Sequence, residues 1–329
     1  MMNPFYELTK SGQARRLRRL ALNALDCYDL NVVSLDLLTN QTNTIFKLKT
    51  IAGDQRILRV TAPEGGHTAD HVTAEIDWLL ALTRDTSLIV PRPLPARNGD
   101  LVIKAGAAGV PEERFCVIFK WMPGSNLARY LSYQNISRLG ELSARLHAHT
   151  RNYCPPANLD LLVYDRPCPF PESLDLFERA YTSLFTEPQQ ILFDQWLQRI
   201  QKAIDRLTSS GDRRQIIHGD LHQWNVRYYH GELSPFDFED LLWGWPVQDI
   251  STSLYYFIDQ PDFGEMRSAF ETGYRRIAPW PEKAEGEINS FIGARGIGLI
   301  NYVLHYGNQW GVDPCEFATR IEKRLKRLA

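Results

Sequence analysis

The spacing of apolar residues changes from mainly strand-like to mainly helical near residue 122, and this change limits the folds that the chain can adopt. Before it, β-prone runs separated by turns predict strands, with two helical segments among them. The strands are expected at 31–38, 44–50, 56–61, 101–105 and 115–120, and the helices at 14–25 and 68–82. Pro123, Gly124 and Ser125 form a turn and helix-cap signal at the change itself.

After the change, the helical period covers most of the chain. Helices are predicted at 136–149, 172–186, 189–208, 247–258, 264–276, 283–304 and 314–328. One segment, 215–238, interrupts them with short β-prone runs and turns. We therefore predict an α+β chain with two lobes: an antiparallel sheet with helices in residues 1–122, and a mainly helical lobe in residues 123–329. A chain of 329 residues can bury two such cores.

The charge balance argues against a polyanionic partner. Lysine and arginine number 37 and aspartate and glutamate 39, so the formal net charge of −2 does not favour binding to nucleic acid or to an anionic membrane. Five widely scattered cysteines without a Cys-x-x-Cys pair predict reduced thiols rather than disulfides or a zinc site. The arginine-rich start of the chain does not have the pattern of a signal peptide, so we expect a cytoplasmic protein.

Three oxygen-bearing side chains stand close together in the segment that interrupts the helical half. Asp220 is followed five residues later by Asn225, and Asp237 comes after a short predicted hairpin. Phosphoryl transfer needs a carboxylate to orient and deprotonate a hydroxyl, together with amide and carboxylate oxygens that hold Mg²⁺ against phosphates. The spacing predicts this chemistry.

The motif His-Gly-Asp-Leu-His-x-x-Asn at 218–225 is similar to the catalytic loop of the aminoglycoside phosphotransferase family. That family includes choline, ethanolamine and homoserine kinases and a bacterial stress-response protein kinase, and it has a two-lobed protein-kinase-like fold. The resemblance implies that Asp220 is the catalytic base, that Asn225 and Asp237 bind Mg²⁺, and that His218 braces the loop. It also implies that ATP is the phosphoryl donor. Asp-Phe-Glu at 237–239, in place of the Asp-Phe-Gly of protein kinases, favours a small-molecule acceptor.

By the same resemblance, residues of the first half bind the nucleotide. Arg59 occupies the strand position of a phosphate-binding basic residue, and Glu75 that of its partner on the next helix. Asn43 closes a loop without glycine, 39–43, that would cover the phosphates. Lys120 and Met122 stand where the family presents backbone groups to adenine.

The acceptor is expected to be a small molecule with a hydroxyl and an amine. Carboxylates and aromatic faces both attract ammonium groups, so we assign Glu239, Asp240, Trp243 and His222 to the acceptor site. Packing in the core is the competing interpretation for the aromatic residue.

Three further points stay open at this stage. Asp249, in a Gly-x-Pro-x-x-Asp segment typical of the family, is interpreted as a structural residue that pins the next helix, and His147 as a packed histidine. A stress-response type Ser/Thr protein kinase is the first alternative function. A non-catalytic nucleotide-binding scaffold is the second, because Arg59 replaces lysine and the loop at 39–43 has no glycine.

Overall fold

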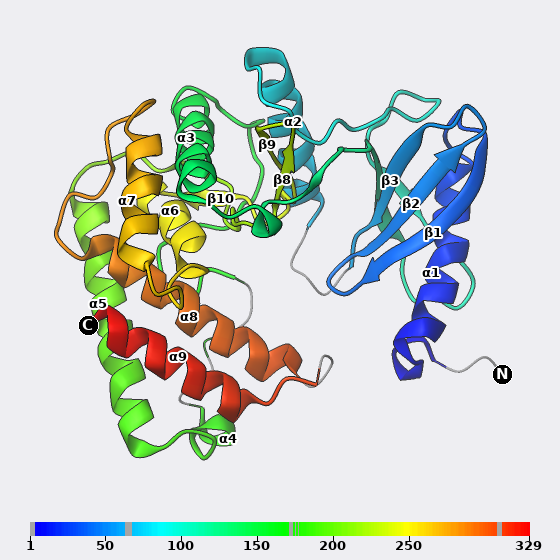
Figure 1. Ribbon diagram of the computed structural model, residues 1–329. Helices are drawn as coiled ribbons and strands as arrows, with labels where there is room; N and C mark the ends of the chain where they lie inside the picture. The colour runs from blue at the N-terminus through cyan, green and yellow to red at the C-terminus, as the bar shows by residue number, and fades with distance from the viewer. Residues whose placement is uncertain (1–3, 63–67, 171–173, 175, 177, 308–310) are drawn as a thin grey trace. The chain divides into compact units, whose positions relative to one another are not determined.

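The computed structural model describes residues 4–62, 68–170, 174, 176, 178–307 and 311–329 (Figure 1). The chain forms two compact units. The first contains Met1–Gly124, Pro155–Asp160 and Ser234–Glu239, and the second contains Ser125–Cys154, Leu161–Leu233 and Asp240–Ala329. No single cut separates them, because the segment that carries Asp237 returns to the first unit.

An antiparallel five-stranded sheet forms the first unit, as predicted. Its order is β1-β2-β3-β5-β4, and each neighbouring pair is antiparallel. The strands are β1 (Val32–Asn40), β2 (Thr44–Thr50), β3 (Gln55–Val60), β4 (Ile103–Ala105) and β5 (Arg114–Lys120). Side chains alternate between the two faces of a strand, so one face of this sheet can be covered by helix α1 (Lys10–Leu25).

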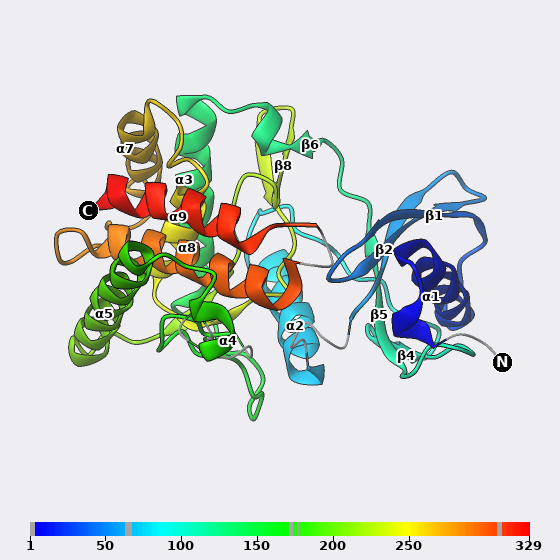
Figure 2. The ribbon, with the colours of Figure 1, turned by 90° about the horizontal axis from the view of Figure 1, so that it is seen from below.

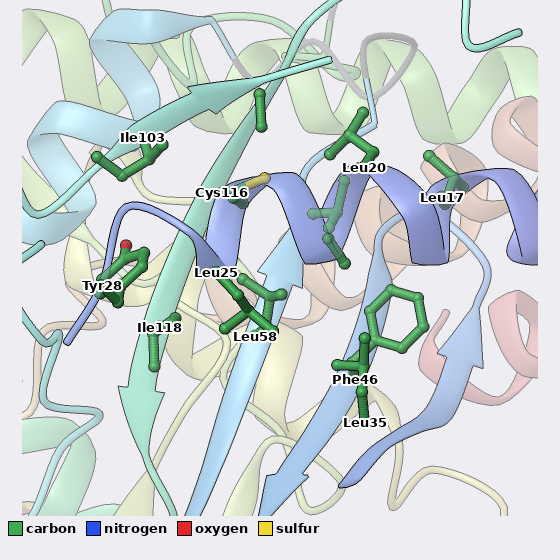
Figure 3. Close-up of a cluster of buried hydrophobic side chains, with 14 of the residues drawn as sticks. Leu17, Leu20, Leu25, Tyr28, Leu35, Phe46, Leu58, Ile103, Cys116 and Ile118 are labelled. Atoms are coloured by element: carbon green, nitrogen blue, oxygen red, sulfur yellow. The ribbon is translucent and has the colours of Figure 1, made fainter. Parts of the chain in front are cut away.

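The core of the first unit lies between α1 and the sheet (Figure 3). Leu17 and Leu20 project from the helix at positions three residues apart and pack among Leu35, Phe46 and Leu58 of three successive strands. All five side chains are buried. The apolar stripe of α1 therefore fixes the helix against the sheet.

Within the first unit, helix α2 (Ala69–Asp85) packs against the returning segment Ser234–Glu239. The Thr68 hydroxyl caps it by accepting a hydrogen bond from the His71 amide at 3.4 Å. The buried ring of Trp78 packs edge-on against Phe238, with ring centroids 5.1 Å apart. This contact holds the residue next to Asp237 in the first unit.

The second unit is mainly helical, also as predicted. Helix α8 contacts α5, α6 and α9. Helix α3 packs on α7 (Figure 2). The helices are α3 (Tyr133–Thr150), α4 (Arg179–Thr182), α5 (Glu187–Ser209), α6 (Pro246–Tyr255), α7 (Phe263–Tyr274), α8 (Glu287–Tyr306) and α9 (Pro314–Leu328). Within the described ranges, no helix combines the length and apolar character needed to cross a bilayer.

Short strands frame the loops of the second unit. β7 (Gln215–Ile217) pairs antiparallel with β10 (Leu242–Gly244). β8 (Val226–Tyr229) lies between β6 (Ser125–Asn126) and β9 (Glu232–Pro235), and the last two residues of β9 belong to the first unit. Strand β10 was not predicted, because three residues are too few to show a period.

The helix predicted at 172–186 is wrong over the described residues. Only α4 is helical there, and residues 172, 173, 175 and 177 lie outside the described part of the chain. The apolar pattern reflects the burial of Leu176 and Phe185 instead. A new helix, α5, then starts with a capping box formed by Thr186 and Gln189.

Two glycines allow α3 and α7 to approach closely. A Cβ on Gly273 would lie 1.7 Å from the carbonyl oxygen of Ser137, and one on Gly140 would lie 2.0 Å from that of Phe270. Neither backbone atom can move without separating the helices. The two glycines therefore set the distance between these helices.

We predict that Gly273→Ala lowers the free energy of unfolding by about 1–3 kcal/mol, because the added methyl group overpacks the α3–α7 contact. Urea unfolding of the wild type and the variant measures this free-energy difference. Gly298→Ala is the matched control: it lies in α8 with open space around its Cβ position. This variant should lose no stability and gain up to about 1 kcal/mol. Equal effects of the two substitutions would contradict the packing argument.

Candidate active site

A buried carboxylate holds the loop that links β7 to β8. Asp249 accepts hydrogen bonds from the backbone amides of His218, at 3.2 Å, and Gly219, at 3.0 Å. Gly219 has φ +80°, and a Cβ on it would lie 2.1 Å from the carbonyl oxygen of Asp240. Only glycine fits both the backbone conformation and the space. The glycine of the His-Gly-Asp motif is therefore required by geometry.

Asp249 is itself fixed by a buried histidine. Nε2 of His147 lies 3.0 Å from Asp249 Oδ2, and Nδ1 lies 3.0 Å from the hydroxyl of Tyr274. All three side chains are almost fully buried. The amide at the start of α6 is satisfied by another residue, Gln248, which accepts from the Trp245 N–H at 2.9 Å. Asp249 thus pins the catalytic loop rather than the end of the helix, and His147 supports it.

Asp220 lies among three side chains that donate to its carboxylate. Nδ2 of Asn225 donates to Oδ2 at 2.9 Å, and Nε2 of His222 lies 3.3 Å from the same oxygen. Arg295, from α8, donates to Oδ1 and also to the hydroxyl of Tyr256 at 2.7 Å. The Asp220 side chain keeps 17% of its exposure, so it can still be reached from solvent.

The sequence analysis did not identify Arg295. It lies 75 residues after Asp220, outside the motif. A signal was nevertheless present, because an arginine in the apolar stretch 291–300 has to find a partner or remain a costly buried charge.

Electrostatics keep the Asp220 carboxylate ionised. Burial by itself raises the pKa of Asp220, but attraction to Arg295 and His222 outweighs it and places this pKa below its usual value. Burial also opposes the charge on Arg295, and Asp220 reverses that effect, so the pKa of Arg295 lies above its usual value. Each residue stabilises the charged form of the other.

The two histidines of the motif have different positions. His218 is fully buried, and its Nδ1 accepts a hydrogen bond from the Asp220 amide at 3.3 Å, which fits the predicted bracing role. Nδ1 of His222 accepts from the Trp224 amide at 3.2 Å, so a neutral His222 carries its proton on Nε2, facing Asp220. The ring of His222 also contacts that of Tyr256, with centroids 4.4 Å apart.

The predicted phosphate-binding residues come together in the first unit. Arg59, on β3, donates to both carboxylate oxygens of Glu75, on α2, with one distance of 2.8 Å. Its Nη1 lies 3.6 Å from Glu239, which also accepts from Nδ2 of Asn43. The Oδ1 atom of Asn43 accepts from the Ala62 amide at 3.0 Å. The structure thus places Glu239 with Arg59, whereas it was predicted to be an acceptor ligand.

The Arg59 cluster carries more negative than positive charge. Burial lowers the pKa of Arg59, but Glu75, Glu239 and Asp237 raise it above its usual value, so the guanidinium stays charged. Its Nε is buried without a hydrogen-bond partner among the described residues. This donor fits a phosphate oxygen, and the surplus carboxylate charge fits a divalent cation.

The oxygen donors predicted for Mg²⁺ are suitable in kind. Both hydrogen bonds from the Asn225 side-chain amide to Asp220 use its nitrogen, which leaves the amide oxygen to bind a metal. Asp237 adopts φ +68°, a conformation that is uncommon outside glycine, so the fold holds it in one backbone position. Magnesium is usually bound by one or two such protein groups together with substrate phosphates. The donor set therefore fits the ion.

The remaining predicted residues are less uniform. The Lys120 amide already donates to the carbonyl of Arg92 at 2.9 Å, whereas Met122 makes no backbone hydrogen bond among the described residues. Of the two, only Met122 can offer its amide to adenine. Asp240 lies close enough to Arg295 to raise the pKa of its guanidinium. Trp243 instead lines a cavity of the second unit whose described lining does not include Asp220.

Comparison with known proteins identifies the family of the chain. Residues 37–285 match the model of the phosphotransferase enzyme family. Over 199 residues the chain is 27% identical to the amicoumacin kinase of Bacillus subtilis (strain 168). The aligned residues make up 59% of this chain and 55% of that protein. The chain thus matches about half the length of this curated relative.

Two solved structures share the fold. A microcompartment-associated aminopropanol kinase superposes with a TM-score of 0.74 at 23% identity, covering 94% of this chain and 95% of the other. The amicoumacin kinase hAmiN, in complex with AMP-PNP, Ca²⁺ and Ami, gives a TM-score of 0.75 at 20% identity, with 98% and 96% covered. The predicted two-lobed protein-kinase-like fold is confirmed. The chain belongs to the phosphotransferase enzyme family, as its catalytic-loop motif predicted.

We predict that Arg295→Gln raises the pKa of Asp220, since the variant loses the guanidinium that, together with His222, opposes the effect of burial. A ¹³C NMR titration of the carboxyl group measures it. In the wild type, the pKa of Asp220 is lower in the folded than in the unfolded protein, where it is about 3.9. Ionised Asp220 therefore stabilises the fold above about pH 3.9, and this stabilisation is lost as pH falls through the folded-state pKa. The variant should lose part of this contribution at neutral pH, because its Asp220 pKa lies closer to the unfolded value.

Arg324→Gln is the matched control for that titration. Arg324 also contacts a tyrosine hydroxyl, that of Tyr255, and pairs with a different aspartate, Asp259. The pKa of Asp220 should not change in this variant. An unchanged Asp220 titration in Arg295→Gln would show that the ion pair does not control the carboxylate.

We predict that Asp249→Asn lowers the free energy of unfolding by about 1–3 kcal/mol. The asparagine side chain has one oxygen, so it cannot replace the two carboxylate oxygens that each accept from one backbone N–H of the loop. It should also speed hydrogen exchange of the amides at 218 and 219. Asp205→Asn, an exposed change on α5, serves as the control and should alter neither. Unchanged exchange in Asp249→Asn would disprove the anchoring role.

Proposed function

We propose that the protein is an ATP- and Mg²⁺-dependent kinase that phosphorylates a hydroxyl group of a small molecule bearing an amine. One observation carries the proposal: an ionised, partly exposed Asp220 is fixed by Asn225, His222 and Arg295 on a loop that Asp249 anchors. A carboxylate held in this way is prepared to orient a hydroxyl.

Asp220 acts on the acceptor. Its carboxylate accepts a hydrogen bond from the acceptor hydroxyl and takes the proton as the oxygen attacks the γ-phosphorus. The new bond joins the acceptor oxygen to phosphorus, and the bond from phosphorus to the β–γ bridging oxygen breaks to release ADP. His222 and Arg295 keep the base in place throughout. A base with a low pKa contributes mainly by orientation in this type of reaction, because the transition state is loose.

We assign a further group of residues to the nucleotide. Asn225 and Asp237 would hold Mg²⁺, which would neutralise charge on the phosphates, and the Arg59 guanidinium would donate to phosphate oxygens. Glu75 orients Arg59, and Asn43 orients Glu239. Met122 offers its backbone to adenine. The proposed use of ATP supports the expected cytoplasmic location.

An amine on the acceptor suits the groups around Asp220. Trp224 is 44% exposed, and its ring packs edge-on to that of Tyr256, with centroids 5.2 Å apart. These aromatic faces attract an ammonium group, and Asp240 adds negative charge near Arg295. The relatives named as kinases of aminopropanol and of amicoumacin support a small-molecule acceptor.

We predict that Asp220→Asn reduces kcat by about 10²- to 10⁴-fold, because the hydroxyl loses its base while the fold is kept. ADP release is measured with Mg-ATP and a panel of amino alcohols, aminoglycosides and a generic protein. Asp194→Asn, an exposed change on α5, should retain full activity.

The same assay separates the alternatives. Transfer of labelled phosphate to the protein substrate alone would support the stress-response type of protein kinase. Nucleotide binding without turnover by any acceptor would support the scaffold function. Full turnover by Asp220→Asn would refute the assigned base.

A further inference from the structure

The second unit contains a cavity of about 350 Å³ that the proposed reaction does not use. It lies at the start of β7, where Gln215 contributes to its wall, and it also borders β10 and the segment after α7. Asp220 follows the other end of the same short strand and is absent from the described lining. The volume is in the range of small-molecule sites. The cavity is therefore a candidate for a second ligand.

The cavity carries an excess of positive charge. Arg151, Arg213, Arg214 and Lys283 line it, with Asp212 as its single acidic residue among those described. Lys283 is paired with Asp212, which leaves three arginines. Cations that line one cavity raise its potential, and an anion relieves their repulsion.

These arginines have donors to spare. The side chains of Arg151 and Arg213 are exposed and form no ion pair within the described ranges. Arg214 lies over the ring of Trp245, 4.7 Å from its centroid, and its buried Nε has no described partner. Guanidinium groups match carboxylate and phosphate oxygens with paired donors. A carboxylate or phosphate therefore suits this part of the wall.

The other part of the wall is aromatic. Trp243, Trp280 and Tyr153 line the cavity and are partly exposed. Trp280 stands edge-on to the buried ring of Tyr274, with centroids 5.4 Å apart and an interplanar angle of 85°, which fixes its orientation. Rings of this kind stack on flat apolar groups. The arginines and these rings together suit a ligand that combines an anionic group with a ring.

Tyr274 links the cavity to the catalytic loop. It lines the cavity, and its hydroxyl lies 3.0 Å from Nδ1 of His147, which contacts Asp249, the anchor of the Gly219 amide. Gln215 adds a second link, because its amide donates to the carbonyl of His147 at 2.9 Å. A group that shifts Tyr274 changes the support of the loop.

We propose that this cavity is a second ligand site for a ring-bearing organic anion, and that Tyr274 transmits its occupancy to the catalytic loop. The effect on catalysis rests on the proposed kinase function. Ligand binding to the cavity and protection of the loop amides do not depend on that function, and both can be measured without turnover.

Phenyl phosphate is the probe for binding, titrated calorimetrically into protein saturated with Mg²⁺ and AMP-PNP so that the nucleotide site is occupied. Inorganic phosphate and benzyl alcohol, each carrying half of the chemistry, should bind at least about tenfold more weakly. The double variant Arg151→Ala, Arg213→Ala should weaken phenyl phosphate binding by about tenfold or more. Arg320→Ala, an exposed change on α9, should leave it unchanged. No binding, or equal binding by both variants, overturns the site.

Hydrogen exchange of the amides at 218 and 219 tests the transmission. Phenyl phosphate should change their exchange rates in the wild type. Tyr274→Phe keeps the ring but removes the hydroxyl contact to His147, so it should still bind the probe and lose this response. An unaltered response in Tyr274→Phe, or no response in the wild type, overturns the transmission while leaving the kinase proposal to its own assay.

Discussion

The candidate active site depends on one buried carboxylate. Asp249 accepts from two successive loop amides, and a histidine on α3 and a tyrosine on α7 hold it in turn. A buried charge is expensive unless its hydrogen bonds are satisfied, so this arrangement is stable only when the loop adopts its bent course through Gly219. The close α3–α7 contact, which requires glycine at two positions, brings these supporting side chains together.

Two arginine–carboxylate pairs, one buried at Arg59 and one partly buried at Arg295, then divide the proposed chemistry. In the first unit, Arg59 is bound by Glu75 and neighboured by Glu239, which suits phosphates and a divalent cation. In the second unit, Arg295 holds Asp220 ionised and oriented. Buried ion pairs contribute little net stability, because desolvation offsets their attraction. Their value in this protein is that each fixes a reactive group in one position.

The sequence anticipated much of the fold, and for a physical reason. The strands of the first unit and most helices of the second have periods of two or 3.6 residues, which follow directly from having one buried face. The prediction failed at 172–186, where Leu176 is buried by a chain that is mostly non-helical over its described residues. It also missed β10, which is defined by pairing with β7 and not by its own residues.

By itself, the sequence determined the family and predicted the chemistry, because its motif places Asp220 and Asn225 within one loop and local spacing fixes such a set. Only the tertiary structure showed that Arg295 reaches Asp220, that Asp249 anchors the loop, and that Glu239 joins Arg59 while Trp243 lines a separate cavity. These contacts join residues from 30 to 180 positions apart. Packing alone brings such residues together, and no local period in the chain records it.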